Sequence, residues 1–173
     1  MKKLILLNGT MGAGKTAICL ELLKLLQPGV FLDGDWCWNM NPFIVNDETK
    51  QMVLKNISFM LNSFINCSEY EYIIFCWVMH QEEIINEILK NLKLENTKTF
   101  TFTLMLTEAA LTKRLIKDID QHKRTFDVLE RSIERIDLYK NMNTIKIDIS
   151  DLTPLQAAKQ IAKLISQKRY YKE

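Results

Sequence analysis

The feature that most constrains this chain is the segment Gly9-Thr10-Met11-Gly12-Ala13-Gly14-Lys15-Thr16, which fits the pattern G-x-x-x-x-G-K-[ST]. The apolar run Leu4–Leu7 precedes it and indicates a buried strand, and an amphipathic run to Leu26 follows it and indicates a helix. The glycines let the backbone curl so that successive N–H groups point at one phosphate chain, and the helix N-terminus adds partial positive charge. The segment and its context therefore predict a phosphate-binding loop.

Two side chains of this loop carry specific roles in the motif. Lys15 is expected to reach the β- and γ-phosphates of a nucleotide, and the Thr16 hydroxyl is expected to ligate Mg²⁺. We therefore predict that all of Gly9–Thr16 binds nucleotide, that Lys15 is also catalytic and that Thr16 is a metal ligand.

Bulk composition limits the class of protein. A length of 173 residues predicts one domain, spanning residues 1–173, with a core of its own. A net charge of +2 is too small to favour nucleic acid or a membrane surface as a partner. No stretch is long enough to cross a bilayer, and the N-terminal apolar run is too short for a signal peptide. The four cysteines lack C-x-x-C spacing, so we expect reduced thiols in a cytoplasmic protein, either a monomer or a homodimer.

Strand-like and helix-like segments alternate along the chain, which predicts an α/β fold with a mainly parallel sheet. The expected strands are Lys3–Leu7, Val30–Asp33, Tyr72–Val78, Thr99–Leu106 and Thr144–Ile149. The expected helices are Lys15–Leu26, a helix to Phe64 with Asp47 as its N-cap, Ile84–Leu92, a helix from Glu108, Phe126–Met142, and a last helix capped by Thr153.

A second constellation follows the second predicted strand, where Asp33-Gly34-Asp35 places two carboxylates after the strand end. In doubly wound sheets, ligands bind beyond the carboxyl ends of the strands, and the phosphate loop lies at that same edge. We assign Asp33 mainly to Mg²⁺, through water, and Asp35 to an acceptor hydroxyl whose proton it accepts. The alternative is an Asp-Gly turn that simply faces solvent.

The third predicted strand separates two classes of phosphate-loop protein. In hydrolytic ATPases an acidic residue ends this strand and holds Mg²⁺, whereas here the run Ile73–Met79 contains no carboxylate. Its absence weakens the interpretation as a motor or switch ATPase. It favours a kinase whose metal carboxylate comes from the second strand.

These residues resemble the small P-loop kinases that phosphorylate metabolites. The segment Phe31–Asp35 is similar to gluconate kinases, and the Asp-x-Asp arrangement with Arg135–Tyr139 is similar to shikimate kinases. The resemblance implies a three-layer P-loop NTPase fold, with a five-stranded parallel sheet in the order 2-3-1-4-5, helices on both faces and a mobile lid. The chain departs from shikimate kinases after the third strand, where Cys76–His80 stands in place of a Gly-rich turn, and from gluconate kinases in having a less basic acceptor site.

The same resemblance suggests roles for later residues. It places the lid at residues 117–125, with Arg124, or its neighbour Lys123, touching the transferred phosphate as a catalytic group. Arg114 would stack on adenine, and Arg135 would hold the acceptor or the phosphates; the alternative for both is an ordinary solvated helix position. Two further expected nucleotide-binding residues, in the loop that backs the adenine, are Asp148 and Ser150.

The acceptor-binding region is expected at about residues 34–66, where Trp36, Trp38 and Phe43 follow the two aspartates. Aromatic faces there suit a sugar ring, a base or an aromatic drug-like molecule, so Asp35, Trp36, Trp38 and Arg135 are the predicted substrate-binding residues. The alternative is that these apolar groups pack the loop against the next helix. Trp77 and His80 are candidates for the opposite wall.

The sequence therefore predicts an ATP- and Mg²⁺-dependent phosphotransferase that moves the γ-phosphoryl group to a hydroxyl of a small molecule, such as a sugar, an alcohol or an antibiotic. One alternative is a nucleoside monophosphate kinase, which usually needs several arginines in its acceptor site, whereas Trp36–Asn66 contains none. Another is a non-catalytic, ATP-binding regulatory module.

Overall fold

The computed structural model describes residues 1–122 and 124–167, so Lys123 and the last six residues lie outside the described part. The strands are β1 (Lys2–Asn8), β2 (Gly29–Asp33), β3 (Tyr72–Cys76), β4 (Thr97–Met105) and β5 (Ile145–Asp148). The α-helices are α1 (Lys15–Leu25), α2 (Asp47–Asn66), α3 (Glu82–Lys90), α4 (Glu108–Asp120), α5 (Asp127–Glu134) and α6 (Pro154–Ser166). Two 3-10 helices are η1 (Gly34–Trp38) and η2 (Ile136–Tyr139).

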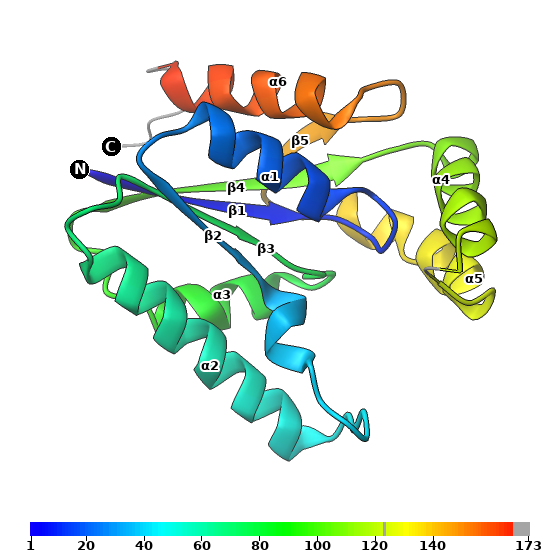
Figure 1. Ribbon diagram of the computed structural model, residues 1–173, viewed down its shortest axis with the longest axis horizontal. Coiled ribbons are helices and arrows are strands. Elements are labelled where there is room, and N and C mark those ends of the chain that lie inside the picture. Colours follow the sequence, from blue (N-terminus) through cyan, green and yellow to red (C-terminus); the bar gives the residue numbers. More distant parts are fainter. Residues whose placement is uncertain (123, 168–173) are drawn as a thin grey trace.

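All strand pairs are parallel, and the sheet order β2-β3-β1-β4-β5 confirms the expected topology. Figure 1 shows α1 and α6 over one face of the sheet and α2 and α3 over the other. Alternate side chains of the central strand serve the two layers, because Ile5 and Leu7 join the core beneath α1 and α6, whereas Leu4 and Leu6 join the core that includes α2 and α3. A strand covered on both faces reads as a continuous apolar run, as β1 does.

The topology gathers the functional segments at one edge of the sheet. The phosphate loop follows β1, Asp33 ends β2 and Asp35 lies just beyond it, and α4 follows β4 at the same edge (Figure 1). No helix among the described residues has the length and apolar character needed to cross a membrane.

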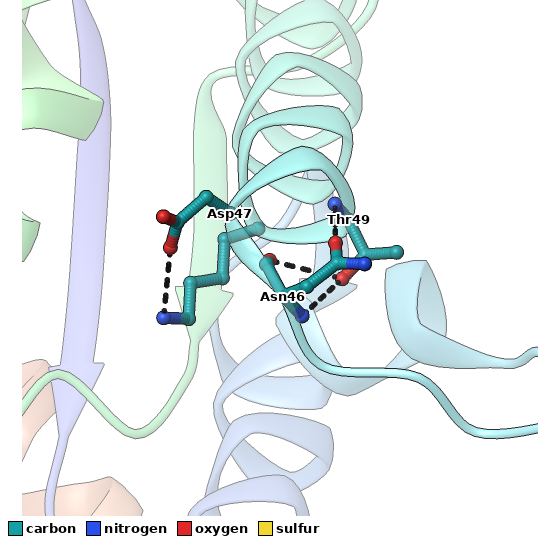
Figure 2. Close-up of polar contacts among 4 residues, drawn as sticks. Asn46, Asp47 and Thr49 are labelled. Carbon is teal, nitrogen blue, oxygen red and sulfur yellow. Dashed lines mark hydrogen bonds and ion pairs between the residues drawn. The ribbon is translucent and has the colours of Figure 1, made fainter.

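The start of α2 differs from the sequence prediction, because Asn46 rather than Asp47 is the N-cap. The Asn46 side chain accepts from Thr49 N at 2.9 Å, and the Thr49 hydroxyl accepts from Asn46 N at 3.0 Å (Figure 2). Asp47 is instead the first helical residue and pairs with Lys50 at 3.3 Å. A threonine in the third position supports this capping box, in place of the usual Glu or Gln that sequence reasoning seeks.

Two other predicted boundaries are wrong. The helix expected over Phe126–Met142 is divided into α5 and η2, because Val128 packs in the core of α1 and α6 whereas Tyr139 and Met142 are buried in the other core. Strand β3 ends at Cys76, opposite the last residue of β2, and not at Val78. Beyond it, the Asn8 side chain takes over the backbone hydrogen bonds of Met79.

The α2 cap yields a stability prediction. Asn46→Ala removes one side-chain acceptor from the helix start and is expected to lower the free energy of unfolding by about 1 kcal/mol. Asp47→Ala should have a smaller effect, because its ion pair with Lys50 is exposed to solvent. Urea denaturation of the two variants measures the difference, and a larger loss in Asp47→Ala would contradict the assignment of the cap.

Candidate active site

The loop between β1 and α1 has the geometry of an anion cradle. Gly12 and Gly14 adopt φ angles of 79° and 89°, in the left-handed region where glycine is unstrained. No side chain caps the N-terminus of α1, and no acidic residue occupies its first turn, so its backbone N–H groups are open to an anion. Lys15 folds back over the loop, where its Nζ donates to Gly9 O at 3.0 Å and to Thr10 O at 3.1 Å.

The loop is held in place from beneath. Gly9 and Thr10 are buried, and the Thr10 hydroxyl donates to Ser132 O of α5 at 2.9 Å. The buried Asn8 side chain accepts from Gly9 N at 2.8 Å and from Met79 N at 2.9 Å, which joins the loop to the segment after β3. Asn8 is a positioning residue that the sequence motif alone does not reveal, because it lies one residue before the pattern begins.

Arg114 of α4 connects three segments. Its guanidinium donates to Ala13 O of the phosphate loop at 3.0 Å and to Ile149 O and Leu152 O, both after β5, at 2.5 and 3.4 Å. Arg114 also lines the cavity above the loop, where the sequence placed the nucleotide. Burial lowers the pKa of its guanidinium, which still remains a cation at any physiological pH.

The two aspartates lie beside the loop. Thr16 Oγ1 donates to Asp33 Oδ2 at 2.5 Å, and the other oxygen of Asp33 accepts from Asp35 N at 3.1 Å. Thr16 is exposed, and Asp33 is nearly buried at the start of η1. A hydroxyl and a carboxylate in contact fit a Mg²⁺ ion, which takes few protein oxygens and completes its shell with water and phosphate. The described residues contain no cluster of three or more His, Cys, Asp or Glu side chains that could hold a metal without such help.

Asp35 has the electrostatics of a proton acceptor. The surrounding walls withdraw water from its carboxylate although it faces an open cavity, and this desolvation raises its pKa above the usual value of 3.8. The charge of Asp33 raises the pKa further, while Lys15, Arg124 and a hydrogen bond to Trp77 partly oppose the shift. Burial also lowers the pKa of Lys15, opposed by the two aspartates.

Gly34 allows the two carboxylates to stand so close to Trp77. A Cβ atom at this position would lie 2.5 Å from Trp77 Cγ and 2.7 Å from its Cδ1, far inside contact distance. The indole therefore packs directly on the backbone between Asp33 and Asp35. Glycine in this motif serves a close approach of a side chain, and not merely a turn.

A cavity of about 1490 Å³ extends from the phosphate loop across Asp35. It is larger than the roughly 300–1,000 Å³ typical of a site for one drug-sized ligand, so two substrates fit side by side. Its walls contain most of the predicted site residues: Met11, Gly12, Ala13, Gly14, Lys15, Thr16, Asp35, Trp36, Trp38, Arg114, Arg124 and Arg135.

Some predicted site residues do not line this cavity. Gly9, Thr10 and Asp33 lie just behind its surface, where they support the lining residues. Asp148 and Ser150 form a local turn, in which Asp148 Oδ1 accepts from Ser150 N at 2.9 Å and from its hydroxyl at 2.7 Å. The structure does not bring these two residues into the cavity wall.

The far wall belongs to the segments after β3 and after α4. Trp77, Val78 and His80 line it, and the side-chain Nδ1 of His80 is buried without a hydrogen-bond partner among the described residues. Burial lowers the pKa of His80, and the nearby charge of Arg135 lowers it further. His80 therefore stands as a neutral polar group on the cavity.

The expected lid region contributes Lys117, Gln121 and Arg124 to the cavity. Arg124 Nε pairs with Asp118 Oδ2 at 3.3 Å, so this guanidinium is tethered to α4. Asp118 and Val45 also line the cavity; they fall inside the predicted lid and acceptor-binding regions but were not singled out, whereas Leu152 and Pro154 were missed altogether. Such residues carry no local signal, because only the packing of distant loops brings them to one wall.

Comparisons with known proteins identify the family and the fold of the chain. Residues 5–137 match the model of a family described as AAA domain. No curated protein sequence matches the chain significantly.

Solved structures share the fold over nearly the whole chain. A gluconokinase from Sinorhizobium meliloti 1021 is 15% identical, with 94% of this chain and 93% of that chain covered and a TM-score of 0.65. A shikimate kinase from Acinetobacter baumannii, in complex with shikimate, is 18% identical, with coverage of 99% and 97% and a TM-score of 0.66. A tunicamycin resistance protein from Deinococcus radiodurans is 17% identical, with coverage of 97% and 98% and a TM-score of 0.65.

The electrostatics of the site predict that the ionised Asp35 carboxylate lowers the stability of the folded protein. Its folded-state pKa is raised, so the ionised carboxylate is disfavoured by folding at pH values above that pKa. Asp35→Asn is therefore expected to raise the urea midpoint at pH 7, with the gain disappearing as the pH falls toward the unfolded value of 3.8.

Asp118→Asn is the matched control for this measurement. Asp118 lines the same cavity but faces the cation of Arg124, so its replacement should not stabilise the protein. An Asp35→Asn variant that is less stable than the parent at pH 7 would contradict the destabilising effect assigned to the ionised Asp35 carboxylate.

Proposed function

This chain belongs to the AAA domain family and has the fold of small-molecule P-loop kinases, and from this premise we propose that it is an ATP- and Mg²⁺-dependent phosphotransferase with a small hydroxyl compound as acceptor. The observation that carries the proposal is the position of Asp35. Its carboxylate lines one cavity together with the phosphate loop, and its neighbour Asp33 contacts the Thr16 hydroxyl.

The reaction follows from these positions. The backbone N–H groups of the loop bind the phosphate chain of ATP, and Lys15 leaves the loop carbonyls to contact the β- and γ-phosphates. Mg²⁺, held through Thr16 and Asp33, supplies charge neutralisation on the phosphate oxygens when it is bound. The acceptor hydroxyl attacks the γ-phosphorus, the bond to the β-bridging oxygen breaks, and ADP leaves.

Asp35 orients the acceptor hydroxyl and takes its proton. A carboxylate with a raised pKa is a better proton acceptor than an ordinary one. Arg124 lines the same cavity. It exchanges its ion pair with Asp118 for a contact with the transferred phosphoryl group and neutralises the charge of that group. Arg114 fixes Ala13 and the segment after β5 around the nucleotide.

Several features distinguish this function from the alternatives. A nucleoside monophosphate kinase binds a second phosphate and needs no proton acceptor, whereas Asp35 would repel such an acceptor. On the acceptor side of the cavity, Arg135 is the arginine present among the described lining residues, beside three tryptophans. A non-catalytic nucleotide-binding module has no need of a desolvated carboxylate at this place. We place the reaction in the cytoplasm, where ATP is available.

The acceptor class is tested by a phosphorylation screen that contains sugars, neutral alcohols, hydroxylated antibiotics and nucleoside monophosphates. The printed name of one structural neighbour, a tunicamycin resistance protein, supports the inclusion of antibiotics. ADP release that depends on a hydroxyl compound supports the proposal. Turnover with nucleoside monophosphates alone would favour the alternative.

The role of Asp35 gives a direct prediction. Asp35→Asn keeps the shape of the side chain but removes the proton acceptor, so acceptor-dependent ADP release should fall at least about 100-fold. Binding of Mg²⁺-ATP should remain within about threefold of the parent, because the loop and Thr16 are untouched. Coupled ADP assays and calorimetry measure the two quantities.

Asp137→Asn is a suitable control, because Asp137 is exposed, pairs with Lys140 and lies outside the cavity wall. Its turnover should equal that of the parent. Unchanged turnover in Asp35→Asn would refute the assignment of Asp35 as proton acceptor.

A further inference from the structure

Large apolar side chains line the acceptor end of the cavity and yet remain open to solvent. Trp36 is 57% exposed, Phe43 is 66% exposed and Val45 is 54% exposed, and all three lie on the cavity wall. We refer to these three residues as the apolar rim. Clustered exposed apolar surface at a site marks a place where an apolar ligand or partner packs.

The rim is supported by ring contacts. The Trp36 ring meets Phe31 edge to face at a centroid distance of 5.3 Å, and Phe43 lies tilted against Trp38 at 5.9 Å. Phe31 is buried and Trp38 is half-buried, so each contact ties an exposed ring to a side chain nearer the core. The rim is therefore a preformed surface, which lowers the entropic cost of binding.

Polar groups line the same cavity. Asp35 directly precedes Trp36, and Asn39 and the unpartnered Nδ1 of His80 belong to the same cavity. The cavity thus presents both these polar groups and the apolar rim. This combination matches a molecule with a hydroxylated head and an apolar substituent.

We propose that the acceptor is such an amphipathic hydroxyl compound, with its head at Asp35 and its apolar substituent packed on Trp36, Phe43 and Val45. This inference rests on the proposed function, because it names the substrate class of the same site. A small, fully polar sugar or acid would leave the rim uncovered and would gain nothing from it.

The tryptophans supply a binding signal for this proposal. The chain has three tryptophans, Trp36, Trp38 and Trp77, and every one of them lines the cavity. Intrinsic fluorescence therefore reports on the acceptor site. The probes are n-alkyl β-D-glucosides from methyl to hexyl, titrated below their micellar concentrations in the presence of Mg²⁺ and a non-hydrolysable ATP analogue.

The expected result is a dissociation constant that falls about two- to fourfold for each added methylene, since burial of one methylene is worth up to ~0.8 kcal/mol. Phe43→Ser and Val45→Ser should each flatten this dependence. Phe59→Ser is the matched control, because Phe59 is 74% exposed on α2 but lies outside the cavity wall, so the dependence should persist.

Three outcomes overturn the inference: no binding by any glucoside, affinity that is independent of chain length, or a dependence that survives in both rim variants. If the rim packed against the lid and not against the acceptor, the two rim variants would lower turnover equally for all acceptors. This result would also overturn the inference. Failure of the proposed function can be told apart from failure of this inference. In that case the glucosides bind with an affinity that depends on chain length, but no acceptor causes the release of ADP. ADP release without chain-length dependence would refute the amphipathic acceptor alone.

Discussion

The hydrogen bond between the Thr16 hydroxyl and Asp33 joins the two halves of this site, and the rest of the arrangement depends on it. Thr16 comes from the first turn of α1 and Asp33 from the end of β2, and these elements meet because β3 pairs with both β1 and β2. The contact sets the distance between the phosphate cradle and the acceptor side. Asp35, whose backbone N–H donates to the same carboxylate, inherits its position from that contact.

The site concentrates features that a stable protein would avoid. Two carboxylates lie close together, a lysine is desolvated, and His80 Nδ1 has no partner in the described structure. Each of these features raises the free energy of the folded state, and each makes a chemical group more reactive or more available to a ligand. The central strands β1 and β3 compensate, because the side chains of Leu4–Leu7 and Ile73–Cys76 are completely buried on the two faces of the sheet.

The phosphate loop is tied to distant parts of the chain through backbone carbonyls. Thr10 reaches α5, and Arg114 of α4 reaches the loop and the segment after β5. The nucleotide and lid regions therefore share supports, so a shift in α4 or α5 changes the loop as well. The apolar rim stands apart from these supports, on η1 and the segment between η1 and α2, which leaves it free to differ from the acceptor sites of kinases with the same fold.

The sequence by itself determined the phosphate loop, the α/β alternation and the identity of the paired aspartates, because each is a local pattern with a local physical reason. It also located the N-cap of α6, Thr153, which acts through a neighbour in the chain. It missed the Asn46–Thr49 box, which is local but has Thr where the usual pattern has Glu or Gln. It could not find the change from α5 to η2 or the cavity residues Leu152 and Pro154. Only the tertiary structure decided these, since the division of Phe126–Met142 depends on which of two cores receives each side chain, and a cavity wall depends on loops that meet across the sheet edge.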